Sequence, residues 1–422
     1  MPAEKKFDVL ILGAGPAGLS AAIGLADSGL SVAMIEKSEF PKNKTCGDGL
    51  TLDVVHQLRL LSPELEEAFM NFPLKFPVYG TGIFSPDFRN ISIPSVCKGQ
   101  SRPMYTCRRK DFDHFLFQYI RKFENIHIFK NTKALNVIQD EESISIHTVE
   151  SDFTGKILIF ADGASSLSSE IQGKKKRTKE HRTLGIRAYY KDIMPFNDNR
   201  YIEIYFIKDI LPGYFWIFPL GNGLSNVGMG VKVSTLKERN ISIKEKFEEL
   251  IEREPLKQRF EKAICVEQAK GHLLPMAGKK ESISGSRFII AGDAAGLVDP
   301  FSGEGVGNAI RSGRVAAAHV KNCFTAADFS AGFNKAYDKE LFRRLGKEFL
   351  IGRIMLQCCK SQGLLQFFIG TIGKNEKHLA TFHKALEGYS SGEKGKGIYL
   401  ILKLLYILTI QNIISSVKKN KS

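Results

Sequence analysis

Short, largely apolar runs alternate with glycine-rich turns near the start of the chain. Residues 7–12, FDVLIL, form one such run, which is typical of a strand buried on both faces of a parallel sheet. We expect a helix over about residues 16–28, ended by Gly29, and a second buried strand over Val32–Ile35. This order predicts a βαβ unit in which the first turn lies at the N-terminus of the helix.

Two later segments repeat the pattern of an apolar strand that ends in aspartate and glycine. One is ILIFADGASS, residues 157–166, and the other begins with RFIIAGD at residue 287. After a strand over residues 288–291 we expect a loop rich in glycine and proline, and then a helix from about Gly305. Three further strands are expected over residues 201–207, 214–220 and 225–233.

The first turn carries Gly13, Gly15 and Gly18 in a G-x-G-x-x-G arrangement. The first glycine permits a tight turn, the second lets a pyrophosphate approach the backbone, and the third lets helix and strand pack closely. Glu36 follows the second strand, where a carboxylate can bind a ribose 2′-hydroxyl. The unit therefore predicts FAD or NAD and disfavours NADP at this site.

The charge balance bears on the partner rather than on the fold. The 422 residues carry a net charge of +15, with a sequence pI of about 9.3, and this favours an anionic partner. Because no zinc-like or RNA-binding motif accompanies the charge, we expect an anionic membrane surface, no nucleic acid and no metal site. Seven cysteines and no signal-peptide pattern predict a cytoplasmic protein that associates peripherally with the membrane.

The three glycine-containing motifs together resemble those of flavoproteins of the p-hydroxybenzoate hydroxylase type. CRRKDFDHFL, residues 107–116, adds that family's arginine near the FAD pyrophosphate as Arg109. Two stretches narrow the resemblance to the geranylgeranyl reductase family. They are KTCGDGL, residues 44–50, and YFWIFP, residues 214–219, which resembles a Y-x-W-x-F-P motif. The resemblance covers about residues 5–320 and implies noncovalent FAD.

The motifs and the resemblance assign three sets of site residues. FAD is expected to contact Gly13, Gly15, Ala17, Gly18, Glu36, Lys37, Cys46, Gly47, Arg109, Asp162, Gly163, Gly292, Asp293, Pro300, Gly303, Gly305 and Val306. Of these, Asp293 is expected to accept a hydrogen bond from a ribityl hydroxyl. The substrate is expected to contact Tyr214, Trp216 and Phe218, and the catalytic candidates are Cys46, Trp216 and Tyr214.

The aromatic segment contains the single tryptophan of the chain. Alternation along a strand places Tyr214, Trp216 and Phe218 on one face, and Phe215 on the other, where a core position is expected. An isolated alkene must become cation-like before it accepts a hydride, and an aromatic face can stabilise that charge by up to about 2 kcal/mol per ring. The same face could line an apolar tunnel. Cys46 is expected to be a proton donor or a redox thiol, with a small packing residue as the alternative.

The expected fold is α/β, with a Rossmann-like FAD-binding domain of the p-hydroxybenzoate hydroxylase type, an antiparallel-sheet substrate domain and a helical C-terminal region. The FAD domain is expected to take residues 1–75, 100–170 and 266–330, and the substrate domain residues 76–99 and 171–265. Residues 331–422 read as helical and end in a hydrophobic, basic tail. We expect the tail to lie in or on the membrane; burial against the protein is the alternative.

These features predict an FAD-dependent oxidoreductase that reduces carbon–carbon double bonds in the prenyl chain of a lipid or quinone. An FAD-dependent monooxygenase or halogenase shares the three motifs and is one alternative, and a non-catalytic flavin- or lipid-binding protein is another. The chain lacks a second glycine fingerprint, and it has Ser169-Glu170 where the family pattern continues to an arginine. The electron donor is therefore left open between NAD(P)H and a reduced ferredoxin-like protein.

Overall fold

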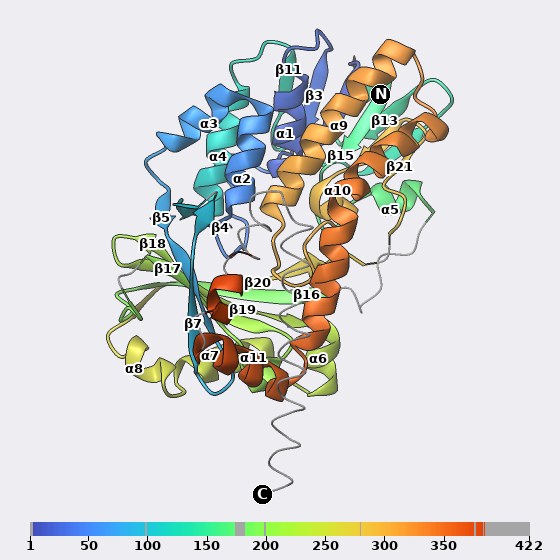
Figure 1. The fold of residues 1–422 in the computed structure, drawn as a ribbon. Helices are drawn as coiled ribbons and strands as arrows, with labels where there is room; N and C mark the ends of the chain where they lie inside the picture. Colours follow the sequence, from blue (N-terminus) through green and yellow to red (C-terminus); the bar gives the residue numbers. More distant parts are fainter. Residues whose placement is uncertain are drawn as a thin grey trace, which may run out of the picture.

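A computed structural model of the protein describes residues 3–97, 99–173, 182–197, 200–278, 280–374, 377–382 and 384. Two layered regions lie one above the other in Figure 1, each built on its own sheet. The upper region carries the N-terminal βαβ unit, the lower region carries a seven-stranded sheet, and the long helix α10 runs down one side of both. This arrangement confirms the predicted α/β fold with its helical C-terminal region.

The upper region contains a six-stranded sheet in the order β11-β3-β2-β15-β22-β21. Its first five strands are parallel, and β21 joins the edge antiparallel. The strands are β11 (Ile126–Phe129), β3 (Val32–Ile35), β2 (Val9–Leu12), β15 (Ile157–Phe160), β22 (Phe288–Ile290) and β21 (Ser284–Gly285). Every residue of β2, β3, β15 and β22 is buried, which confirms the prediction of strands covered on both faces.

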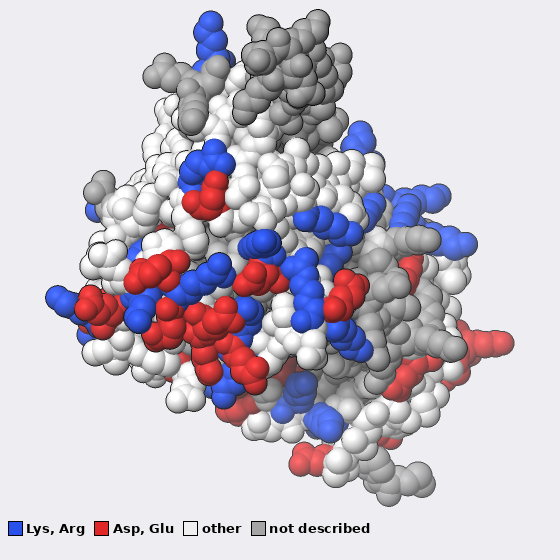
Figure 2. Space-filling model, turned by 90° about the horizontal axis from the view of Figure 1, so that it is seen from below, with Lys and Arg blue, Asp and Glu red and all other residues white. Residues whose placement is uncertain are grey.

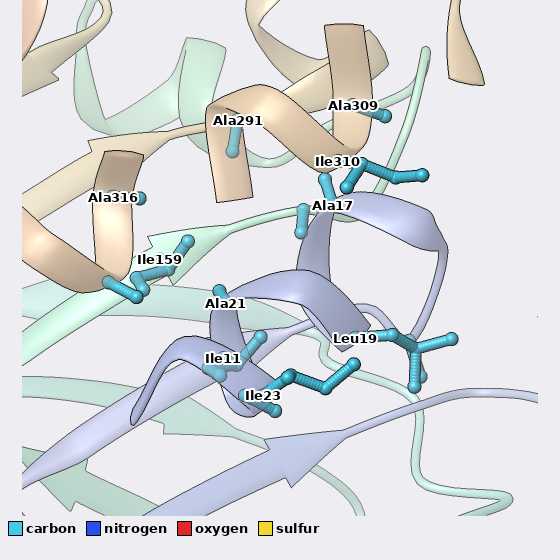
Figure 3. Close-up of a cluster of buried hydrophobic side chains, with 14 of the residues drawn as sticks. Ile11, Ala17, Leu19, Ala21, Ile23, Ile159, Ala291, Ala309, Ile310 and Ala316 are labelled. Carbon is cyan, nitrogen blue, oxygen red and sulfur yellow. The ribbon is translucent and has the colours of Figure 1, made fainter. Parts of the chain in front are cut away.

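Helix α1 (Pro16–Leu25) packs against helix α9 (Val306–Ala326) over this sheet. Figure 3 shows alanines of both helices facing one another beside isoleucines of the strands. The contact is so close that a Cβ on Gly313 would lie 2.1 Å from the carbonyl oxygen of Ala17. Helix α1 ends at Leu25 rather than near residue 28, because the Ser28 N–H and hydroxyl both donate to the Leu25 carbonyl.

Smaller elements surround the upper sheet. Helix α4 (Arg109–Ile120) packs beside α1, and helices α2 (Leu52–Leu61) and α3 (Pro63–Met70) contact each other. A four-stranded sheet has the order β1-β14-β13-β12, and a three-stranded sheet has the order β4-β10-β5. The remaining elements are β1 (Ala3–Lys6), β14 (Ser151–Gly155), β13 (Ile144–His147), β12 (Asn136–Gln139), β4 (Gly49–Leu50), β10 (Met104–Thr106), β5 (Phe76–Val78), β8 (Val96–Cys97), β9 (Gln100–Ser101), α5 (Ser168–Ile171) and the 3₁₀ turn η3 (Gly292–Ala295).

The lower region is a seven-stranded sheet in the order β20-β16-β19-β18-β17-β6-β7. It is antiparallel as predicted except between β17 and β6, which are far apart in sequence and need no hairpin connection. The strands are β20 (Ile264–Pro275), β16 (Arg182–Lys191), β19 (Leu224–Lys232), β18 (Tyr214–Gly221), β17 (Tyr201–Tyr205), β6 (Gly80–Phe84) and β7 (Asn90–Pro94). The domain boundaries remain a prediction, although β20 pairs with β16 as far as Pro275 and so extends this sheet past residue 266.

Helices cover the lower sheet and extend beyond it. α6 (Val233–Glu238), α7 (Ile243–Ile251) and α8 (Leu256–Phe260) flank it, together with the 3₁₀ turn η2 (Lys208–Ile210). α10 (Ala331–Cys358) and α11 (Gln362–Lys374) confirm the predicted helical region as far as it is described, and the predicted membrane tail lies outside the described residues. Among the described helices, none combines the length and the apolar character that crossing a membrane requires. On the lower face, acidic and basic side chains are interspersed despite the net positive charge (Figure 2).

Candidate functional site

The glycine turn between β2 and α1 has the geometry of a backbone cradle. A Cβ on Gly13, whose φ is +99°, would lie 2.5 Å from the Ala161 carbonyl oxygen, and a Cβ on Gly18 would lie 1.9 Å from the Gly13 carbonyl oxygen. A Cβ on Gly15 would instead meet nothing within 4 Å. Packing therefore requires glycine at 13 and 18, while Gly15 borders open space that a pyrophosphate could approach. The turn fits FAD.

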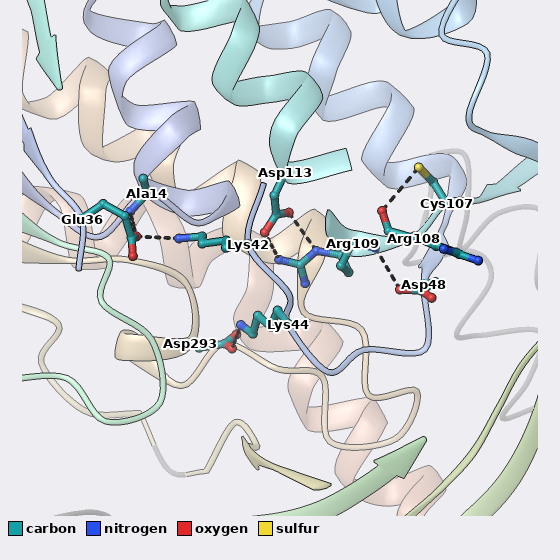
Figure 4. A network of polar contacts seen from close by, with 10 residues as sticks. All are labelled: Ala14, Glu36, Lys42, Lys44, Asp48, Cys107, Arg108, Arg109, Asp113 and Asp293. Atoms are coloured by element: carbon teal, nitrogen blue, oxygen red, sulfur yellow. Dashed lines mark hydrogen bonds and ion pairs between the residues drawn. The ribbon is translucent and has the colours of Figure 1, made fainter. Parts of the chain in front are cut away.

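Glu36 is held rigidly at the end of β3. Its Oε2 accepts hydrogen bonds from the Ala14 N–H at 2.8 Å and from Lys42 Nζ at 2.5 Å (Figure 4). Its Oε1 accepts one from the Ser38 N–H at 3.0 Å. Burial alone would raise the pKa of Glu36, but the Lys42 charge and these hydrogen bonds outweigh it and lower the pKa. The carboxylate is thus kept ionised at the place expected for a ribose hydroxyl, and that contact stays a prediction.

Lys44 connects the KTCGDGL loop to the turn that follows β22. Its Nζ lies 2.8 Å from Asp293 Oδ2, and this ion pair outweighs burial and lowers the pKa of Asp293 (Figure 4). Lys42 and Lys44 therefore both pair with carboxylates that the sequence assigned to FAD. The predicted hydrogen bond from a ribityl hydroxyl would therefore go to the same Asp293 carboxylate that Lys44 already contacts.

Arg109, at the start of α4, forms a buried two-bond ion pair with Asp113. Its Nε and Nη2 donate to the two carboxylate oxygens at 2.9 and 2.8 Å. Burial alone would lower the pKa of the Arg109 guanidinium, but the negative charge of Asp113 and its hydrogen bonds outweigh that effect and raise it. Arg109 therefore stays positively charged, and its charge is balanced by Asp113.

A cavity of about 300 Å³, here called the cofactor cavity, collects most of the predicted residues. Those that line it are Gly15, Ala17, Cys46, Gly47, Arg109, Gly163, Tyr214, Trp216, Phe218, Asp293, Pro300, Gly303, Gly305 and Val306. Those that do not line it are Gly13, Gly18, Glu36, Lys37, Asp162 and Gly292. The cavity brings together the three glycine motifs, the KTCGDGL segment of residues 44–50, here called the cysteine loop, and the aromatic strand β18.

The six residues outside the lining have other positions. Gly13 and Gly18 shape the turn, and Lys37 is exposed. Asp162 follows β15, where its Oδ2 accepts the Leu167 N–H at 2.8 Å and burial raises its pKa. Gly292 has φ +61° and donates its N–H to Ser312 Oγ at 2.9 Å.

The aromatic strand β18 forms one wall of the cofactor cavity. The ring centroids of Tyr214 and Trp216 lie 6.0 Å apart, and those of Trp216 and Phe218 lie 6.1 Å apart. Phe215 points the other way, is fully buried and packs in the apolar core beneath the sheet. Alternation thus predicted correctly which three rings face the cavity. Tyr214, Trp216 and Phe218 are here called the aromatic wall.

A larger cavity of about 590 Å³, here called the apolar cavity, adjoins the cofactor cavity. The two share the lining residues Thr51, Ile202, Phe301, Ser302 and Glu304. The apolar cavity lies among β6, β7, α10 and α11, and its walls include Ile83, Ile91, Ile93, Ile351, Met355, Leu365, Phe368 and Ile369. No residue of the aromatic wall lines it. The predicted substrate residues therefore border only the part of the site next to the cofactor.

Sequence reasoning expected an apolar tunnel along the aromatic wall, but it missed the residues that line the apolar cavity and two polar residues of the site. Glu304 lines both cavities and its Oε1 accepts the Thr51 hydroxyl at 2.6 Å. Asn226, on β19, is fully buried and binds Trp216 Nε1 through its Oδ1 at 2.8 Å. An asparagine inside the apolar pattern of a predicted strand was the available signal for Asn226, because a buried amide needs partners.

Two comparisons of sequence agree with this geometry. The profile of the FAD-binding domain family matches residues 6–320. The digeranylgeranylglycerophospholipid reductase of Thermoplasma acidophilum is 27% identical over 350 residues, which cover 82% of this chain and 85% of that protein. The menaquinone reductase of Mycobacterium tuberculosis is 28% identical over 329 residues, which cover 75% of this chain and 77% of that protein.

Solved structures show the same fold. A geranylgeranyl bacteriochlorophyll reductase-like protein from Thermoplasma acidophilum superposes with a TM-score of 0.78 at 24% identity, covering 95% of this chain and 100% of that chain. A flavin-dependent brominase superposes with a TM-score of 0.73 at 19% identity, covering 99% and 100%. The predicted resemblance to geranylgeranyl reductases is confirmed, and the protein belongs to the FAD-binding domain family, with FAD as its cofactor.

Proposed function

We propose that the protein reduces carbon–carbon double bonds in the prenyl chain of a lipid or a prenylated quinone. The observation that carries the proposal is the apolar cavity of about 590 Å³ that adjoins the cofactor cavity. Its volume and apolar lining suit a hydrocarbon chain, whose reacting bond would lie next to the aromatic wall. The names of the two reductase relatives support the same class of substrate.

The two cavities would contact different parts of the substrate. FAD, when bound and reduced, supplies a hydride to one alkene carbon. The apolar cavity would bind the rest of the chain and remove its hydrocarbon surface from water. Tyr214, Trp216 and Phe218 face the cofactor cavity, where each ring can stabilise developing positive charge by up to about 2 kcal/mol.

Cys46 is our candidate for the proton donor. Its thiol proton goes to the second alkene carbon, so that the alkene gains two hydrogens in total. Cys46 lines the cofactor cavity together with the aromatic wall, where such a proton transfer would take place. Cys46→Ser should retain FAD and lower the rate of alkene reduction, whereas Cys265→Ser, at an exposed cysteine on β20, should leave both unchanged. Full activity in Cys46→Ser would leave the cysteine with a packing role.

An anaerobic single-turnover experiment tests the proposed function. The bound flavin is reduced, prenyl lipids and prenylated quinones are added one at a time, and reoxidation is followed by absorbance. The proposal expects reoxidation together with a lipid product that is heavier by two hydrogens, as measured by mass spectrometry. Oxygen-dependent modification of an aromatic compound would instead support the monooxygenase or halogenase alternative, with which the protein shares the fold. Lipid binding without reoxidation by any substrate would support a carrier.

The electron donor and the location complete the proposal. NADH, NADPH and a reduced ferredoxin-like protein are the candidate donors, and the rate at which each bleaches the flavin distinguishes them. A substrate with a long prenyl chain stays in the bilayer, so we place the protein in the cytoplasm, bound peripherally to an anionic membrane surface. Flotation with anionic and with neutral liposomes checks this placement, because charge-driven binding requires the anionic lipid.

A further inference from the structure

Asn226 joins the two parts of the site that the sequence singled out separately. Its Oδ1 accepts Trp216 Nε1–H at 2.8 Å, and its Nδ2 donates to the Cys46 carbonyl oxygen and to Asp48 Oδ2, both at 2.7 Å. An indole N–H can only donate and a peptide carbonyl can only accept, so the orientation of the amide is fixed. All the hydrogens of this buried amide are therefore used to connect the aromatic wall to the cysteine loop.

Asp48 fixes the other side of the same connection. It is fully buried in the left-handed region with φ +63°, between Gly47 and Gly49. Its Oδ1 accepts the Arg109 N–H at 3.0 Å, and its Oδ2 accepts the Tyr189 hydroxyl at 2.6 Å as well as the Asn226 amide. The cysteine loop is thus tied to α4, β16 and β19 through one carboxylate.

The indole is also fixed by close packing. A Cβ on Gly228 would lie 2.3 Å from Trp216 Cζ2, so the ring crosses strand β19 where only glycine leaves room. On its other side the ring approaches the cysteine loop, because a Cβ on Gly47 would lie 3.7 Å from Trp216 Cε2. The indole is therefore packed between the strand and the loop, and Asn226 is its hydrogen-bond partner.

We propose that Asn226 and Asp48 are positioning residues that hold the indole of Trp216 and the backbone of Cys46 in one fixed arrangement. This inference rests on the proposed function, because it assigns the pair the task of aligning the aromatic wall and the thiol on the same double bond. Neither residue has to touch the substrate. A shift of the loop away from the wall would separate the charge-stabilising ring from the proton donor.

The single tryptophan gives the inference a direct readout. Protein labelled with nitrogen-15 only in tryptophan shows one indole N–H signal by NMR, and that signal belongs to Trp216. In the FAD-loaded protein we expect a downfield signal that exchanges slowly with solvent. Asn226→Ala should move the signal upfield and speed its exchange, whereas the control Asn136→Ala, at an exposed position of β12, should leave it unchanged. An unchanged signal in Asn226→Ala overturns the inference.

Kinetics test the positioning role itself. Asn226→Ala should retain FAD and lower kcat for alkene reduction by about 10²-fold, with a much smaller change in KM, because misalignment by about 1 Å can cost that much. Trp216→Phe keeps an aromatic ring but removes the pyrrole half of the indole together with its N–H, so the double variant should be little worse than the more impaired single variant. The positioning role would be contradicted if the two substitutions reduced kcat by independent factors that multiply in the double variant. An unchanged kcat in Asn226→Ala would also contradict it.

Tyr189→Phe provides a milder variant if Asn226→Ala does not fold. It removes one donor to Asp48 and keeps the ring, which packs 4.0 Å from the Arg187 guanidinium. A shifted Trp216 signal in this variant supports the connection through Asp48, and an unchanged signal contradicts it. The NMR result does not depend on any lipid. If the wild-type protein reduces no prenyl chain, the proposed function fails, and the indole signal still decides whether Asn226 holds the ring.

Discussion

The cofactor cavity and the apolar cavity share five lining residues but are built in different ways. Glycine turns and the ion pairs of Lys44 and Arg109 shape the first, and each of these depends on one backbone position or one charge. Side chains from strands and helices shape the second, and they have little in common except that they are apolar. The difference teaches that single-atom changes should disrupt the cofactor cavity, whereas the apolar cavity should respond mainly to volume.

The largest expected effect comes from Gly18→Ala. Because the new Cβ would lie 1.9 Å from the Gly13 carbonyl oxygen, the turn has to move. We expect the variant to lose FAD and to lose about 1–3 kcal/mol in its free energy of unfolding. Gly15→Ala is the matched control, since its Cβ meets nothing within 4 Å, and it should fold with unchanged stability and bind FAD more weakly. Flavin content and thermal unfolding measure both effects.

The opposite result for Gly18→Ala would remove the expected difference between the two cavities. If Gly18→Ala retained FAD and full stability, the turn would tolerate single-atom changes in the same way as an apolar wall. The two cavities would then differ in composition but not in how they are specified.

Glu36→Gln tests the charge at the end of β3, outside the lining of the cofactor cavity, and its effect should depend on pH. Lys42 and the backbone donors lower the pKa of Glu36 below its usual 4.5. A carboxyl with a lowered pKa in the folded protein contributes stability above its unfolded pKa and loses it as the pH falls through the folded pKa. The variant should be less stable by about 1.5–3 kcal/mol at neutral pH. The difference in free energy of unfolding between the variant and the unmodified protein should shrink below about pH 4.5. Denaturant titrations at several pH values measure it, and a difference that stays constant with pH would contradict the ion-pair account.

Met355→Trp should affect only the apolar cavity. Met355, on α10, lines this cavity and not the cofactor cavity, so a larger side chain should shorten the space for the chain. We expect unchanged FAD content and a loss of about 10-fold or more in kcat/KM for long prenyl substrates, with less loss for short ones. Ile138→Trp, at an exposed position of β12, is the control. Equal losses for long and short substrates would show that the cavity does not hold the chain.

The same contrast explains how much could be predicted from the sequence. The glycine turn, Glu36 and the alternating rings of β18 depend on local spacing, so the sequence located the cofactor cavity and the aromatic wall. The hydrogen bonds that connect that wall to the cysteine loop, however, depend on the tertiary fold. Asn226 lies on the neighbouring strand β19, and its contact with Cys46 spans 180 residues of sequence.

The apolar cavity could not be predicted because its residues carry no motif. Ile91 on β7, Ile351 on α10 and Phe368 on α11 look like ordinary core positions when each is considered alone. Only the packing of the C-terminal helices against the edge of the seven-stranded sheet leaves a space between them. The pairing of Lys44 with Asp293 was missed for a related reason, since the two residues are 249 residues apart in the sequence.

The central claim is that the aromatic wall stabilises charge on an alkene held between the two cavities. Fluorinated tryptophans test it directly, because the chain has one tryptophan and incorporation alters only Trp216. Each added fluorine weakens the attraction of the ring for a cation while changing its size little. The account predicts that the anaerobic single-turnover rate of prenyl reduction falls stepwise with the number of fluorines, at constant FAD content. Equal rates across the series would contradict it.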